Sequence, residues 1–136
     1  MLWCSKCVRS ERTASCLISL RFCRAPPYFC ACRQLPNAPP TFRADPSVYK
    51  LLYEDQNIRV ISATWAKGVH DKPHSHPIPS VAYALDDCTI RLYAPDGTTR
   101  DITNKAGSAT EVPITRSHTA ENIGPADCHV VFVEHK

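Results

Sequence analysis

From Ala44 onward, apolar and β-branched residues form short runs that turn residues separate. The run NIRVISATW at 57–65 is typical, because its apolar and polar side chains point to opposite faces of an extended strand. The pattern predicts strands at 57–65, 80–85, 88–93, 98–102, 109–113, 118–123 and 128–134. Segment 47–55 fits either a helical turn or an opening strand. No segment of this region sustains the 3.6-residue apolar period of an amphipathic helix.

Turn residues indicate how these strands connect. Asp86 and Asp87 predict a tight hairpin between 80–85 and 88–93, and the sequence APDG at 94–97 predicts the next turn. Gly124 and Pro125 separate the last two strands. Many short strands at this spacing are typical of a sandwich or barrel, and about 90 residues suffice for one small barrel with a single core. The prediction is an all-β domain over residues 44–136.

The first 43 residues differ in charge and in cysteine content. They hold seven basic residues and one acidic residue, a charge of +6, whereas residues 44–136 carry −3. They also hold six of the eight cysteines. We expect a disordered, basic, Cys-rich leader over 1–43, with a composition like that of an organelle transit peptide. Cys4 and Cys7 form a CxxC that is a weak alternative signal for half of a zinc site.

Targeting signals are weak throughout the chain. Arg21 and Arg24 follow the longest apolar run of the leader, where a signal peptide has small residues before its cleavage site. No run approaches the roughly 20 apolar residues of a transmembrane helix. A cytoplasmic location is expected. Met1 is the only methionine, so we expect the working protein to begin near Leu35 at a non-AUG codon.

Composition excludes several classes of function. The net charge of +3 is small, and residues 44–136 contain no basic aromatic surface for nucleic acid. They also contain neither a phosphate-binding glycine loop nor a GxSxG nucleophile motif. We expect a small-molecule ligand, no specific nucleic acid and no membrane.

Three histidines carry the chemistry. His74 and His76 are two residues apart in extended chain, so both side chains leave the same face, as two ligands of one metal ion must. Alone, this pair is weak evidence, and two solvated loop histidines between Pro73 and Pro77 would be the commoner explanation. His118 favours the metal interpretation. It lies in a second segment with regularly spaced glycine, proline, histidine and asparagine residues, GSATEVPITRSHTAEN at 107–122.

The two segments resemble the cupin superfamily motifs G(x)5HxH(x)3–4E(x)6G and G(x)5PxG(x)2H(x)3N, and the resemblance covers nearly all of the chain after Asn57. Matching positions are Gly68, His74, His76, Gly107, Pro113, His118 and Asn122. Three positions depart from the motifs. The glutamate falls on Ser80 or Val81, the later glycine on Asp87 or Cys88, and the glycine after the second-motif proline on Thr115.

The resemblance implies a small cupin-type, jelly-roll-like β-barrel of the conserved cupin 2 type. It implies a divalent metal, either Fe, Zn, Mn or Ni, held by His74, His76 and His118 with Asn122 in support. The motif glutamate, which this sequence lacks, is the fourth protein ligand in the superfamily. Three imidazoles still hold a divalent ion and leave it more acidic and more open. Thiol dioxygenases and a diketone-cleaving dioxygenase in the resembling superfamily use such sites.

Dioxygenase-like or isomerase-like chemistry on a small metabolite is therefore expected, although enzymatic activity itself is left open. The alternatives are a metal-free module that binds or senses a small ligand, and a structural barrel with vestigial histidines. Small barrels of this superfamily commonly pair, so we expect a homodimer built partly from segment 47–61.

Other side chains are weighed by their position. Tyr83 and Val81 are expected to face the cavity, with Tyr83 as the acid or base and Val81 beside the metal. Arg91, on the strand expected to pair with that of Tyr83, is a candidate for binding a substrate carboxylate. His70 and Asp71 are expected in a solvated loop. Cys88 and Cys128 are expected to be small buried hydrophobes without reactive chemistry.

Overall fold

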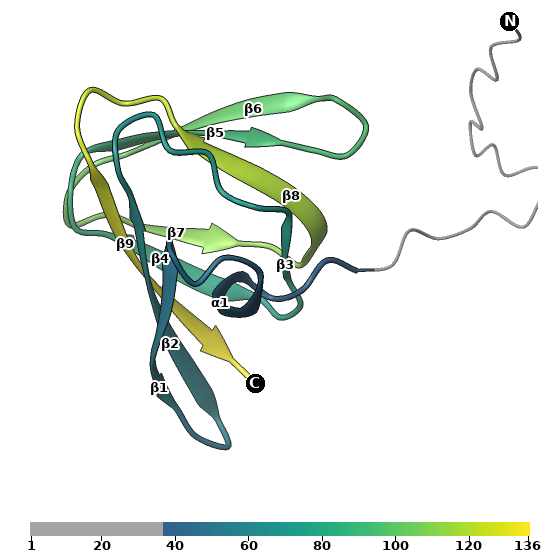
Figure 1. Cartoon of the computed structure of the whole chain (residues 1–136). Coiled ribbons are helices and arrows are strands. Elements are labelled where there is room, and N and C mark those ends of the chain that lie inside the picture. The colour runs from purple at the N-terminus through teal and green to yellow at the C-terminus, as the bar shows by residue number, and fades with distance from the viewer. Residues whose placement is uncertain (1–36) are drawn as a thin grey trace, which may run out of the picture. The chain divides into compact units, whose positions relative to one another are not determined.

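Two antiparallel sheets face each other in the computed structural model, which describes residues 37–136 (Figure 1). The five-stranded sheet has the order β1-β2-β9-β4-β7 and the four-stranded sheet the order β3-β8-β5-β6. The elements are α1 (Thr41–Ala44), β1 (Tyr49–Glu54), β2 (Ile58–Trp65), β3 (His74–His76), β4 (Ser80–Ala84), β5 (Cys88–Tyr93), β6 (Thr99–Asn104), β7 (Ala109–Val112), β8 (Thr115–Asn122) and β9 (Cys128–His135). The prediction of an all-β fold is confirmed.

The apolar core lies between the two sheets because each strand alternates its side chains. On β9, alternate residues from Cys128 to Glu134 are buried, and on β2 Ile61, Ala63 and Trp65 are buried. From the other sheet, Ile90 and Ala120 complete the same cluster. The period of two seen in the sequence therefore reports burial on one face. Segment 47–55, left open by the sequence, is mainly the edge strand β1.

The predicted hairpin at Asp86 and Asp87 is wrong. Strand β4 pairs with β7 and β9, whereas β5 pairs with β6 and β8, so this turn carries the chain from one sheet to the other. The two carboxylates serve neighbouring loops: Asp86 accepts from the backbone N–H of His129 at 3.2 Å, and Asp87 from that of Ala106 at 3.0 Å. The next turn does close a hairpin, between β5 and β6, with Gly97 at φ 86°.

The ordered fold begins before residue 44. The backbone N–H of Ala38 donates to the carbonyl of Arg116 at 3.0 Å, and that of Ser75 donates to the carbonyl of Pro39 at 2.9 Å. Residues 38–43 therefore attach to the barrel, and the predicted boundary is several residues too late. The rest of the leader, including the CxxC motif and Leu35, lies outside the described residues. Within residues 37–136, no helix has the length and apolar character needed to cross a bilayer.

Cys88 and Cys128 form a disulfide that connects the first residues of β5 and β9. Both residues are buried, as predicted, but the expectation of two separate hydrophobes is wrong. Their Cα atoms lie 5.4 Å apart although 40 residues separate them in sequence. Closing a loop of this length stabilises a fold by roughly 3–4 kcal/mol in the chain-entropy account. The link holds the two sheets together at one end.

Candidate metal centre

Strands β3 and β8 bring the three predicted imidazoles together. In the register of this pair His74 lies opposite His118, and a one-residue irregularity then places His76 opposite Thr115. One ring nitrogen from each histidine lies within 4.8 Å of those of the other two. The closest pair is the Nε2 atoms of His74 and His118, at 2.8 Å. The geometry therefore places together the three residues that the sequence assigned to the metal.

Burial keeps two of these imidazoles, those of His76 and His118, in the neutral form that binds metal. His74 and His76 are fully buried, and His118 is partly buried. Burial, with the neighbouring imidazoles as a second cause, lowers the pKa of His76 to about 3 and that of His118 to about 4. Protons therefore do not compete with a metal ion for these two rings near neutral pH.

The hydrogen bonds of the rings fix which nitrogens face the centre. The Nδ1 atom of His74 lies 2.9 Å from the carbonyl oxygen of Lys72, so this nitrogen carries the proton and Nε2 keeps its lone pair. The Nδ1 atom of His76 is buried and has no hydrogen-bond partner among residues 37–136. A buried unpaired nitrogen beside two further imidazoles fits a metal site, because coordination satisfies nitrogens that no protein donor reaches.

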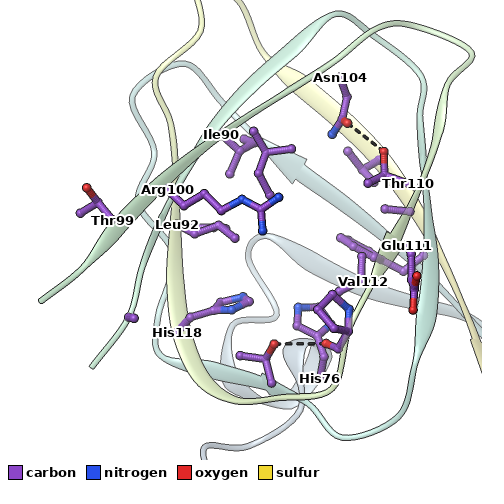
Figure 2. Close-up of a pocket in the computed structure, with 18 of the residues that line it drawn as sticks. His76, Ile90, Leu92, Thr99, Arg100, Asn104, Thr110, Glu111, Val112 and His118 are labelled. Carbon is purple, nitrogen blue, oxygen red and sulfur yellow. Dashed lines mark hydrogen bonds between the residues drawn. The ribbon is translucent and has the colours of Figure 1, made fainter. Parts of the chain in front are cut away.

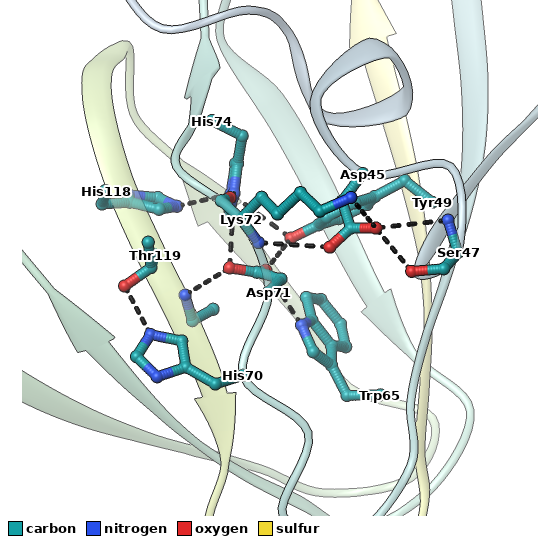
Figure 3. Close-up of polar contacts among 11 residues, drawn as sticks. Asp45, Ser47, Tyr49, Trp65, His70, Asp71, Lys72, His74, His118 and Thr119 are labelled. Carbon is teal, nitrogen blue, oxygen red and sulfur yellow. Dashed lines mark hydrogen bonds and ion pairs between the residues drawn. The ribbon is translucent and has the colours of Figure 1, made fainter.

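A buried carboxylate supports the centre from behind (Figure 3). Asp71 accepts hydrogen bonds from the Tyr49 hydroxyl at 2.6 Å, the Trp65 indole N–H at 3.0 Å and the Ala120 backbone N–H at 2.7 Å. Its Oδ1 atom also lies 3.5 Å from Nδ1 of His74. Burial alone would raise the pKa of Asp71, but His74 and these donors outweigh it and hold the pKa below its ordinary value.

The expectation of a solvated loop at Asp71 is therefore wrong, since the residue is 5% exposed. Its neighbour His70 does lie outside the metal centre, where its Nε2 atom is 2.6 Å from the Thr119 hydroxyl and its ring stacks on Tyr93. The sequence offers one signal for Asp71: it lies three residues before the first ligand, within reach of the same ring. Carboxylates behind a ligating histidine commonly set its orientation and basicity.

A cavity of about 360 Å³ opens beside the imidazoles (Figure 2). His76 and His118 lie on its wall, whereas His74 does not line it. Most of the remaining wall is apolar and includes Ile90, Leu92, Ile102, Val112, Val130 and Phe132. A small molecule in this cavity would therefore meet the metal site on the side of His76 and His118.

Asn122 has a role in the fold, and its side chain makes no hydrogen bond to the three rings. It is buried, and its amide donates to the carbonyls of Trp65 at 3.0 Å and Ala126 at 2.8 Å. Its Oδ1 atom accepts from the backbone N–H of Gly124 at 2.9 Å. Asn122 thereby fixes the turn between β8 and β9 and supports the centre only through the position of β8.

The expected orientation of Tyr83 and Val81 is wrong. On β4 the buried side chains are those of Ser80, Ala82 and Ala84, so Val81 and Tyr83 point outward, 47% and 44% exposed. Tyr83 does not line the cavity and is not in position to act as its acid or base. Of the two positions where the motif glutamate falls, Ser80 is the inward one, and its buried hydroxyl has no partner among residues 37–136.

Arg91 also faces outward, contrary to the prediction. Its guanidinium makes two bonds to Asp101, at 2.7 and 2.9 Å, on the outer face of the β5–β6 pair. The arginine that lines the cavity is Arg100, which the sequence interpretation missed. Strand parity could have found it: Arg100 pairs with the apolar Leu92, and residues directly opposite in a sheet share a face.

Comparison with solved structures identifies the fold. The chain is similar to a cupin domain from Bordetella pertussis, with a TM-score of 0.60 and 16% identity over 76% of this chain and 97% of that chain. It is also similar to an RmlC-like cupin family protein with a double-stranded β-helix fold from Methanocaldococcus jannaschii, with a TM-score of 0.53 and 15% identity over 65% and 78% of the two chains.

A third similar structure is an uncharacterized conserved protein with a double-stranded β-helix domain from Klebsiella pneumoniae, with a TM-score of 0.52 and 19% identity over 65% and 75% of the chains. No protein-family model and no curated protein matches the sequence. Identities this low establish the fold, and the function is inferred from the site. The chain has the double-stranded β-helix fold of the cupin superfamily, as its two histidine motifs predict.

Proposed function

We propose that this protein binds a divalent transition metal through His74, His76 and His118 and acts on a small molecule in the adjoining cavity. The observation that carries the proposal is the convergence of three imidazoles, two of which line a largely apolar cavity. Imidazole ligands favour Fe, Zn, Ni or Cu, whereas Mn prefers oxygen ligands. Iron, zinc and nickel are thus better candidates than manganese.

Three neutral ligands leave the full charge of the ion and some of its coordination positions free. When bound, such an ion supplies Lewis acidity or a site for O2. Because His76 and His118 line the cavity, an ion held by the three imidazoles would be accessible to a molecule in the cavity. The apolar wall excludes water from a molecule held there.

Oxygenase-like chemistry fits this cavity better than isomerase-like chemistry. Moving a proton between carbon atoms needs a general base that points at the substrate. The cavity is lined by one carboxylate, that of Glu111, which points away from its centre in Figure 2. With His76 and His118 assigned to the metal, the described residues supply no base at the required place.

Azide binding to the cobalt-loaded full chain tests the proposal. Co(II) bound by three imidazoles with free positions gives visible absorption bands that shift when azide adds to the ion. We expect a saturable shift in the wild type and none in a His76→Gln, His118→Gln variant. Wild-type protein that takes up no Co(II), yet is stabilised against heat by small apolar molecules in EDTA, would instead support the metal-free binding module.

The cytoplasmic location remains a prediction. The disulfide between Cys88 and Cys128 weighs against it, because cytosolic thiols are generally kept reduced.

A further inference from the structure

We propose that Arg100 binds the carboxylate of the cavity's ligand, so that the preferred ligand is a small apolar monocarboxylate with a metal-binding donor at its other end. This inference deepens the proposed function. The metal-binding donor of the ligand rests on the proposed metal site, whereas the carboxylate rests on Arg100 alone. It places the specificity for an anion on a residue that belongs neither to the metal site nor to the cupin motifs.

Strand parity directs Arg100 inward. It lies on β6 directly opposite Leu92 of β5, and two residues further on Ile102 lies opposite Ile90. Ile90, Leu92 and Ile102 all line the cavity, and Arg100 shares their face. In Figure 2 the guanidinium reaches from β6 toward the middle of the cavity, above His118.

The guanidinium of Arg100 has no partner among residues 37–136. The arginine and lysine ion pairs of residues 37–136 engage Arg59, Lys72, Arg91, Lys105 and Lys136, and the Arg100 side chain makes neither an ion pair nor a hydrogen bond to any described residue. Arg91, which lies between the cavity-lining Ile90 and Leu92 on the neighbouring strand, shows the contrast, because the carboxylate of Asp101 accepts two hydrogen bonds from its guanidinium.

Arg100 is an exposed residue at the rim of an apolar cavity, where its unpaired guanidinium is accessible to an entering anion. Guanidinium binds carboxylate through two parallel hydrogen bonds, which are stronger than hydrogen bonds between neutral groups. The other charged residue of the lining, Glu111, points away from the centre, so it neither neutralises Arg100 nor repels an entering anion. The charge of the cavity is therefore positive at Arg100 and would be positive again at the metal.

The space between these two charges sets the rest of the ligand. Apolar side chains from both sheets line it, including Leu92, Val112 and Phe132. They favour a short hydrocarbon body. His76 and His118 line the same cavity, so a thiol or oxygen donor of the ligand would reach an ion held by the three imidazoles. A ligand with these three parts is a small ω-mercapto, hydroxy or oxo acid.

The test uses the cobalt-loaded full chain and two probes that differ in charge only at one end: 4-mercaptobutanoate and 4-mercaptobutanamide. Thiolate binding to Co(II) gives a near-ultraviolet charge-transfer band whose growth yields a Kd. We expect the wild type to prefer the carboxylate by roughly tenfold, as a charge-assisted bidentate pair gives. Arg100→Gln should remove the preference, and Arg91→Gln, the matched control on the outer face, should keep it.

Equal affinity for the two thiols in the wild type, or a preference that survives in Arg100→Gln, overturns the role of Arg100 while leaving the metal site intact. Absence of the band with both thiols counts against the metal proposal instead. In that case 4-methylpentanoate and 4-methylpentanamide are compared by thermal shift on metal-free protein. Stabilisation by the acid that Arg100→Gln abolishes supports the anion site, and equal shifts overturn it.

Discussion

The Nε2 atoms of His74 and His118 lie 2.8 Å apart, on residues that face each other in the β3–β8 pair. In the metal-free protein one of the two nitrogens must donate a proton to the other, and a metal ion relieves this need because both lone pairs are able to face it. Converting both imidazoles to imidazolium ions at this distance would set two like charges together in a largely buried place. The centre is thus sensitive to acid.

Metal-free protein should lose stability as the pH falls from about 6.5 toward 4, the ordinary histidine range and below. The pKa of His118 in the folded chain is about 4 and that of His76 about 3, so the unfolded chain binds more protons than the folded one over this window. The free energy of unfolding should fall by about 1.4 kcal/mol per pH unit for each histidine.

Urea denaturation in EDTA at several pH values measures this slope. His76→Gln and His118→Gln should each reduce the slope by about one proton's contribution. His135→Gln, which changes an exposed residue at the end of β9, should not. An unchanged slope in the first two variants would show that these rings titrate normally in the folded protein.

Asp71→Asn should destabilise the protein and weaken the metal site. The carboxylate accepts three hydrogen bonds in a buried place, and an amide would turn an N–H₂ group toward at least one of these donors. We expect a loss of roughly 2–4 kcal/mol in unfolding free energy and of about 10–100-fold in metal affinity. Tyr49→Phe removes one donor and keeps the ring, so its loss should be smaller. A melting temperature of Asp71→Asn equal to that of the wild type would contradict the role of this carboxylate.

Ser80→Glu should restore a fourth ligand, whereas Val81→Glu should not. Ser80 is the inward residue of the two, 4% exposed, and Val81 is on the outer face. Without metal the buried glutamate of the Ser80 variant lacks a partner and costs several kcal/mol. With Zn(II) it should regain stability beyond the gain of the wild type. Melting curves with and without metal separate the two variants, and equal behaviour would place the metal elsewhere.

A homodimer through segment 47–61 remains a prediction. Strand β1 is an edge of its sheet and exposes three large apolar side chains, Leu51, Leu52 and Tyr53. Edges of this kind are commonly covered in the native protein. Light scattering at micromolar concentration should give twice the chain mass, and Leu52→Glu should shift it toward the monomer. A monomeric mass for the wild type would disprove the dimer.

The strands and the metal ligands could be predicted because both depend on short-range spacing. Alternation marks a strand wherever one face is buried, and the HxH pair needs only extended chain between its two rings. The predictions that failed concern contacts between residues that are far apart in the sequence. Nothing in the run at 80–85 says that β4 pairs with β9, 44 or more residues later, and nothing near Cys88 points to Cys128.

The orientation of β4 shows a second limit. The motif glutamate falls on Ser80 or Val81, and residues 77–79 lie between β3 and β4, so parity cannot be carried from His76 across this loop. One residue of difference turns Tyr83 from the cavity to solvent. The prediction for Arg91 failed although parity could be followed here: Arg91 follows the inward-facing Ile90, and the hairpin turn at 94–97 places Arg100 opposite the apolar Leu92.

Metal content tests the central claim most directly. Full-length protein is loaded separately with Fe(II) without air, Zn(II) and Ni(II), freed of unbound metal by gel filtration and measured by inductively coupled plasma mass spectrometry. The proposal predicts one ion per chain for at least one metal in the wild type and in a His135→Ala control, and almost none in a His74→Ala, His76→Ala variant that remains folded. Wild-type stoichiometry near zero for all three metals, or equal content in the double variant, would contradict the metal centre.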